Sequence, residues 1–146
     1  MTFNFRGVEK SSGRMGDGTE EQNDLLAICN YAQNQLKYSQ IFIIGYSYGG
    51  LISLSTARKL KKIVGMTLIS YPMGFTEHLT PDYDVNFPIL FIHGEHDDVI
   101  PQLRVQQSLP SFKNRTKFVS VTTDHFYNGR EKEVGIIIGE FLSQVG

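Results

Sequence analysis

The sequence has few of the features that mark secreted, membrane-bound or nucleic-acid-binding proteins. It contains no tryptophan and only one cysteine, so no disulfide can form within the chain, which is typical of a reducing compartment. We expect neither a signal peptide nor a membrane span, because no apolar run is long enough for one. The 14 basic and 15 acidic side chains give a net charge of −1, which predicts no basic face for nucleic acid. These absences predict a cytoplasmic protein.

The sequence contains enough apolar residues to form one domain with a hydrophobic core. Hydrophobic residues make up 40% of the 146 positions, so we expect a single domain over residues 1–146. The one cysteine, Cys29, shares an apolar stripe of a predicted helix with Leu25, Ala32 and Leu36. This pattern favours a small core residue over a reactive thiol.

Apolar periodicity divides the chain into alternating strands and helices. Predicted strands cover residues 2–6, 41–44, 62–72, 87–94 and 116–121. Predicted helices cover residues 19–37, 48–61, 101–109 and 131–145, and residues 72–87 form a polar loop. Buried strands joined by helices predict an α/β fold, with a mostly parallel sheet of about five strands and helices on both faces. Ligands of such sheets bind beyond the carboxyl ends of the strands.

A serine flanked by glycines follows the apolar run at 41–44. Gly45, Ser47 and Gly49 fit the pattern G-x-S-x-G, a strand–turn–helix in which the serine is forced into a tight, exposed turn. The backbone N–H of Tyr48 then lies at the positive end of the next helix, where it can stabilise a developing oxyanion. The alternative is a glycine-rich turn in which the serine has no role.

Two phosphate-binding interpretations of the same glycines fail on the residues themselves. A dinucleotide-binding turn needs a second glycine where Ser47 stands, and an acid where the next strand ends in Ser70 and Tyr71. A P-loop needs lysine after its last glycine, but Leu51 follows Gly50.

An acid and a histidine follow two later strands in the order that a serine hydrolase of this kind requires. Asp97 comes after the strand at 87–94, and His125 comes after the strand at 116–121. A serine hydroxyl needs a base to take its proton, and the base needs a carboxylate to hold its tautomer. The predicted triad is therefore Ser47, Asp97 and His125.

Other acids and histidines remain as alternatives. Asp98 could replace Asp97 but could instead cap the next helix, and Asp82 or Asp84 could supply the carboxylate from an earlier strand. Asp124 adjoins the histidine, a position from which its side chain would more often point away.

Histidines near the predicted acid raise the alternative of a metal site. His93 and His96 form an H-x-x-H pattern, but this spacing aligns metal ligands on a helix and not on a strand that runs into a loop. We expect His93 to be a partly buried structural residue. We expect no metal and no organic cofactor.

Three segments together resemble the α/β-hydrolase superfamily: "GYSYGG", "PILFIHGEHDDVIP" and "TDHF", in this order. The likeness is to small, lidless members of the dienelactone-hydrolase and serine-aminopeptidase-like kind. Their pattern H-G-x-x-D-x-x-V-P places the catalytic acid on Asp97, with Ile100 in place of the valine. "FNFRGVEKSSG" resembles their F-N-F-R-G-V-G-x-S strand and loop, with Glu9 in place of a glycine.

The resemblance implies that this chain corresponds to the carboxyl-terminal two-thirds of such a hydrolase, a truncated α/β-hydrolase core. In the family, the strand matched by residues 3–6 is the fourth, and the loop after the third strand donates the second oxyanion N–H. Loss of one oxyanion donor reduces turnover by about 10²–10³. Residues 3–6 must also either pair with 41–44 or leave an open sheet edge.

The expected function is a serine hydrolase that cleaves an ester, thioester or related acyl bond. Ser47 would carry the acyl group, His125 would act as base and then acid, Asp97 would orient it, and Tyr48 N–H would bind the oxyanion. With only a loop between residues 70 and 87, we expect an open site for a small-molecule or acylated substrate. The alternatives are a non-catalytic scaffold that pairs with a partner's strand at the open edge, and a fragment of a longer hydrolase.

Overall fold

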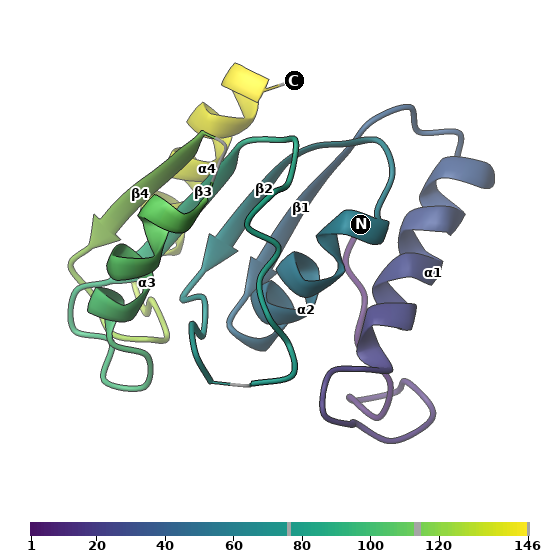
Figure 1. Cartoon of the computed structure of the whole chain (residues 1–146), viewed down its shortest axis with the longest axis horizontal. Coiled ribbons are helices and arrows are strands. Elements are labelled where there is room, and N and C mark those ends of the chain that lie inside the picture. Colours follow the sequence, from purple (N-terminus) through teal and green to yellow (C-terminus); the bar gives the residue numbers. More distant parts are fainter. Residues whose placement is uncertain (76, 113–114, 146) are drawn as a thin grey trace.

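The computed structural model describes residues 1–75, 77–112 and 115–145, and its strands form one parallel sheet. Within these residues the four strands are β1 (Ile41–Tyr46), β2 (Ile63–Ile69), β3 (Ile89–Gly94) and β4 (Thr116–Val121). They lie in chain order, and each is parallel to its neighbour (Figure 1). Their carboxyl ends therefore meet at one edge of the sheet, where the sequence predicts the site.

Helices cover both faces of this sheet, which confirms the predicted α/β fold. The helices are α1 (Glu21–Asn34), α2 (Tyr48–Thr56), α3 (Gln102–Ser108) and α4 (Glu131–Val145), with 3₁₀ turns at Ala57–Lys59 and Leu109–Ser111. Side chains of α1, α2 and α3 join one buried cluster, and Val134 and Phe141 of α4 join another. Figure 1 shows α2 and α3 in front of the sheet and α4 behind it. None of the helices in the described ranges is long and apolar enough to cross a bilayer.

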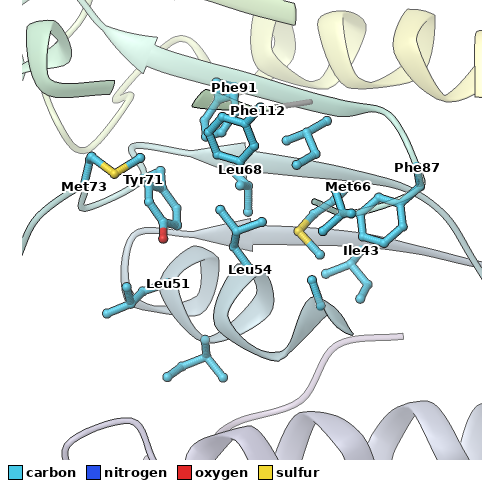
Figure 2. Close-up of a cluster of buried hydrophobic side chains, with 14 of the residues drawn as sticks. Ile43, Leu51, Leu54, Met66, Leu68, Tyr71, Met73, Phe87, Phe91 and Phe112 are labelled. Carbon is cyan, nitrogen blue, oxygen red and sulfur yellow. The ribbon is translucent and has the colours of Figure 1, made fainter. Parts of the chain in front are cut away.

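The larger cluster lies between α2 and the sheet. Leu54 of α2 lies beside Met66 and Leu68 of β2, as Figure 2 shows, and Leu51 belongs to the same cluster. Burial of one such leucine stabilises the fold by about 1.5–3 kcal/mol. Cys29 of α1 is 6% exposed in the same cluster, which confirms that it is a core residue.

The predicted strand at residues 2–6 is wrong. No strand is assigned there, so the described residues form four strands and not about five. Phe3 and Phe5 instead pack on the larger cluster, and the Phe5 ring meets the Tyr48 ring edge-on at 5.9 Å. Both the backbone N–H and the guanidinium of Arg6 donate to Asp24 of α1, at 2.9 and 2.7 Å. The segment is therefore held by side chains, and β1 keeps an outer edge without a strand neighbour among the described residues.

Helix α1 begins two residues later than the sequence predicts. The Glu21 carboxylate, which is fully buried, accepts hydrogen bonds from the N–H groups of Gly16 and Gly18. This carboxylate thus fastens the glycine-rich loop to the start of the helix. The predicted loop at 72–87 contains no helix or strand among its described residues, and Thr76 lies outside them.

Candidate active site

Ser47 lies between the last residue of β1 and the first residue of α2, in a strained turn. Its φ of 49° and ψ of −117° are unusual for a residue with a side chain, and such a conformation costs about 1–3 kcal/mol. The turn is held because Ser47 N–H donates to Ile69 O at 2.8 Å, and Gly50 N–H donates to Ser47 O at 2.9 Å. This is the strand–turn–helix geometry expected of G-x-S-x-G.

The glycines of this turn allow the helix to start directly against the strand. A Cβ on Gly45 would lie 2.6 Å from Gly50 Cα and 2.8 Å from Gly49 O. Tyr48 is the first residue of α2, and the N–H groups of the first helical turn have no partner within the helix. Among the described residues the Tyr48 N–H has no acceptor. It remains able to donate to a bound group.

Asp97 and His125 are in direct contact at the same edge of the sheet. Asp97 Oδ2 accepts a hydrogen bond from His125 Nδ1 at 2.8 Å, and the Asp97 side chain is 0% exposed. Its other oxygen, Oδ1, accepts from the N–H groups of Val99 and Ile100 at 3.1 and 2.7 Å. Because an ionised carboxylate can only accept, the imidazole carries its proton on Nδ1, which leaves Nε2 able to take a proton.

The charge of this carboxylate is stabilised by its hydrogen bonds. Burial alone would raise the pKa of Asp97, but the hydrogen bonds from Ile100 N–H, His125 and Ser70 outweigh it and hold the pKa below its ordinary value. Asp97 is therefore ionised at neutral pH. The Asp97 carboxylate can therefore orient the His125 ring and stabilise its imidazolium form.

A close backbone contact brings the histidine to the acid. His96 N–H donates to Thr123 O at 3.0 Å, which joins the turn after β3 to the loop after β4. A Cβ on Gly94 would lie 2.6 Å from Thr123 O and 2.7 Å from Asp124 O. Glycine at position 94 is thus required for this approach.

The serine turn and the histidine loop are linked through Tyr46. Its hydroxyl donates to His125 O at 2.8 Å, and the two rings lie 5.5 Å apart. Among the described residues no hydrogen bond joins Ser47 Oγ to His125. The structure thus brings the predicted acid and base into contact and places the serine turn beside them. Hydrogen bonds between a nucleophile and its base are often long in unliganded enzymes.

The alternative acids lie in other surroundings. Asp98 and Asp124 are exposed, and Asp124 accepts a hydrogen bond from Phe126 N–H within its own turn. Asp82 pairs with Arg58 at 2.8 Å. Of the candidate acids, Asp97 is the one hydrogen-bonded to His125.

The two histidines of the H-x-x-H pattern diverge. His93 is fully buried and not partly buried as expected, and its Nε2 lies 2.6 Å from Ile100 O, whereas His96 is exposed. A carbonyl only accepts, so His93 carries its proton on Nε2, and burial lowers its pKa. In the part of the chain that the structure describes, no three His, Cys, Asp or Glu side chains are grouped to hold a metal.

Sequence reasoning missed Ser70 and Tyr127. Ser70 directly follows β2 and donates from Oγ to Asp97 Oδ2 at 2.8 Å, and the Tyr127 hydroxyl lies 3.0 Å from the same Oγ. The rule that ligands and functional groups gather at the carboxyl ends of parallel strands could have found Ser70. No sequence signal indicates Tyr127.

A parallel sheet with a serine turn and an aspartate–histidine pair at its carboxyl edge is the arrangement of the α/β-hydrolase fold. A sequence model of the dienelactone hydrolase family matches residues 8–129, so the chain belongs to this family.

Two solved structures agree with this assignment, and a curated relative matches most of the chain. An alpha-beta serine hydrolase homologue from Coxiella burnetii is 28% identical, with a TM-score of 0.86 over 95% of this chain and 66% of that one. An a/b serine hydrolase without a lid, from Xanthomonas campestris, is 26% identical, with a TM-score of 0.74 over 86% of this chain and 57% of that one. An uncharacterized protein of Rickettsia prowazekii is 24% identical over 97% of this chain and 63% of its own length. The chain thus spans 57–66% of the length of these proteins.

Proposed function

We propose that this protein is a serine hydrolase that cleaves an ester, thioester or related acyl bond through an acyl-enzyme on Ser47. The observation that carries the proposal is the buried hydrogen bond between Asp97 and His125, at the sheet edge that also holds the strained Ser47 turn. The proposal treats residues 1–146 as one hydrolase-like domain, which the single sheet supports.

The reaction follows from the proton positions. Ser47 Oγ attacks the acyl carbon while its proton passes to His125 Nε2, and Asp97 stabilises the imidazolium through the Nδ1 proton. The leaving group takes the Nε2 proton as its bond to the acyl carbon breaks, which leaves the acyl group on Ser47. A water molecule then gives a proton to His125 and attacks the acyl carbon. The acid is released, and Ser47 Oγ regains its proton.

The proposed oxyanion donor is the Tyr48 N–H at the start of α2. If this N–H acts without a second donor, turnover falls by about 10²–10³ relative to a complete pair. Phe126 and Tyr46 flank the histidine with exposed rings, and the Phe126 ring meets the His125 ring edge-on at 5.5 Å. These rings provide an apolar surface for a small-molecule or acylated substrate. The lidless relative from Xanthomonas campestris supports an open site.

Labelling with a fluorophosphonate probe tests this proposal directly. The folded protein should be labelled, the Ser47→Ala variant should not, and Ser143→Ala should be labelled like the parent. Ser143 is a matched control because it is an exposed residue of α4 whose hydroxyl, among the described residues, donates to Glu140 O within the helix. Absence of labelling in a parent whose circular dichroism shows an intact α/β fold would overturn the proposal.

One observation favours a second candidate, a non-catalytic scaffold that pairs with a strand of a partner protein. The outer edge of β1 has no strand neighbour among the described residues, and an apolar groove of about 310 Å³ runs along it. Phe3, Ile28 and Tyr38 line this groove together with β1. An extended segment can add to such an edge through backbone hydrogen bonds. The N–H groups of Ile41 and Ser47 donate toward β2, so the N–H of Ile44 faces the outer edge. An unlabelled, folded protein that binds a partner and loses the binding on proline substitution at Ile44 would support the scaffold.

Both proposed functions, the serine hydrolase and the non-catalytic scaffold, also apply if the chain is part of a longer hydrolase. The intact mass of the natural protein, measured by mass spectrometry, decides that question independently of activity.

A further inference from the structure

A chain of two hydroxyl groups lies behind the aspartate of the proposed triad. Ser70 is 0% exposed, and its Oγ lies 2.8 Å from Asp97 Oδ2, the same oxygen that His125 contacts. The hydroxyl of Tyr127, also buried, lies 3.0 Å from Ser70 Oγ and 3.3 Å from Ile92 O. These groups come from three segments, after β2, β3 and β4, which meet only in the folded protein.

The direction of these hydrogen bonds follows from what each group can donate. An ionised carboxylate only accepts, so the single proton of Ser70 must point to Asp97. Ser70 Oγ can then only accept a hydrogen bond from Tyr127. The Tyr127 hydroxyl has two acceptors within reach, Ser70 Oγ at 3.0 Å and the Ile92 carbonyl at 3.3 Å. Burial raises the pKa of Tyr127 to about 12, so this hydroxyl keeps its proton at neutral pH. The Ser70 hydroxyl therefore donates to the carboxylate, and Tyr127 is the group that can donate to Ser70 Oγ.

The backbone around Ser70 is built to hold this geometry. Ser70 has a φ of 46°, a left-handed conformation that favours glycine, and its N–H donates to Ile92 O at 2.9 Å. Glycine would adopt this conformation with less strain but would bring no hydroxyl. The residue present thus retains strain at a position where its hydroxyl reaches the carboxylate.

We propose that Ser70, supported by Tyr127, is a positioning residue of the triad, which fixes Asp97 Oδ2 so that it accepts the His125 Nδ1 proton. This inference rests on the proposed hydrolase function. Val99 and Ile100 hold only the other oxygen, Oδ1, so Ser70 is the second donor to the oxygen that faces His125. Loss of the Ser70 hydroxyl allows Asp97 Oδ2 to shift. The negative charge on Oδ2 is then no longer shared with a second donor and acts on His125 alone.

Other titratable groups also face the carboxylate. His93 of β3 has its Nε2 3.5 Å from Asp97 Oδ2, but this nitrogen donates to Ile100 O, and burial lowers the pKa of the ring, which keeps it neutral. Tyr46 of β1 lies against His125, and burial raises the pKa of its hydroxyl, so it is also neutral. Within the described residues, His125 is the group in contact with Asp97 that becomes charged during the reaction.

The test compares the parent with Ser70→Ala and Tyr127→Phe on a p-nitrophenyl ester. We expect Ser70→Ala to reduce kcat by about 10- to 100-fold with KM little changed, since a small misplacement of a catalytic group has effects of this size. The acid limb of the kcat/KM pH profile should also move to higher pH, because the uncompensated carboxylate stabilises the imidazolium more strongly. Tyr127→Phe should also lower kcat and move the acid limb to higher pH, in each case by less than Ser70→Ala does.

Thr56→Val provides the matched control. Thr56 is a fully buried residue of α2 whose hydroxyl donates to Ile52 O at 2.6 Å, so its replacement also removes a buried hydroxyl. It should lower stability without moving the pH profile. A purely structural role for Ser70 would make Ser70→Ala behave in the same way, which would overturn the inference.

A measurement that needs no turnover separates this inference from the proposed function. The Nδ1 proton of His125 should give a low-field NMR signal in the parent that shifts in Ser70→Ala and, if that variant does not fold, in Tyr127→Phe. An unlabelled parent would overturn the hydrolase proposal, and an unchanged NMR signal in a folded variant would overturn the positioning role.

Discussion

Replacing Gly94 with alanine tests whether the histidine reaches the acid because of a close backbone contact at the end of β3. The new methyl carbon would lie 2.6 Å from Thr123 O and 2.7 Å from Asp124 O, far inside normal contact distance. These are backbone atoms, so they cannot turn aside as a flexible side chain can. Either β3 or the loop that carries His125 must move. Overpacking of this kind costs about 1–3 kcal/mol of unfolding free energy.

The same displacement should impair the site. The loop after β4 is joined to the turn after β3 by the bond from His96 N–H to Thr123 O, and this bond lengthens if the loop is pushed away. A shift of about 1 Å in a catalytic group can reduce the rate by about 10². We therefore expect Gly94→Ala to lose most of its fluorophosphonate labelling rate as well as stability.

Urea unfolding, followed by circular dichroism, measures the stability change. For a chain of about this size, 1–3 kcal/mol corresponds to a loss of about 2–12 °C in Tm. Gly135→Ala is the control, because Gly135 lies in α4 and the described residues outside its own helical turn place no atom within 4 Å of the new methyl position. It should raise the unfolding free energy by about 0.5–1 kcal/mol through helix propensity. If Gly94→Ala were as stable as the parent and were labelled as fast, the close contact could not be what positions His125.

Two further predictions concern the charge on Asp97. Asp97→Asn should reduce the rate of fluorophosphonate labelling by about 10⁴-fold, because an amide that donates toward Nδ1 favours the wrong tautomer of His125. A rate within tenfold of the parent would contradict this role of Asp97. The lowered pKa of Asp97 means that its ionised form stabilises the fold above the unfolded-state value of about 3.9, and that this contribution is lost as pH falls through the lower folded value. Urea unfolding from pH 7 to pH 2 should therefore show the stability difference between the parent and Asp97→Asn shrinking below about pH 4, and a constant difference would show that Asp97 is not stabilised in its charged form.

The sequence by itself determined the class of fold and the place of the candidate site. Continuous apolar runs predicted the strands β1 and β3. β3 is buried on both faces as such a run predicts, whereas β1 is the edge strand and exposes Ile44, so full burial was the wrong expectation for residues 41–44. Residues 116–121 and 131–145 form β4 and α4 with the predicted bounds, since strong local periodicity decides such elements. The glycine pattern around Ser47 predicted a turn that only small residues can make. That turn is present, and the catalytic role of Ser47 stays a proposal.

Only the tertiary structure decided which groups meet. The alternation of Phe3 and Phe5 indicates a strand, but their rings pack on the core and Arg6 pairs with α1, so no ladder to β1 forms. Periodicity describes which side chains face one way and cannot show whether a neighbouring backbone is within hydrogen-bond reach.

The surroundings of the aspartate were likewise invisible in the sequence. Ser70 and Tyr127 are 57 positions apart, and neither belongs to a short motif. Their hydroxyl groups meet behind Asp97, which Ser70 contacts, because parallel strands bring distant parts of the chain to one edge of the sheet. Local patterns thus predicted where the site lies, whereas the packing of β2, β3 and β4 set the hydrogen bonds that keep its carboxylate charged and fix the tautomer of its imidazole.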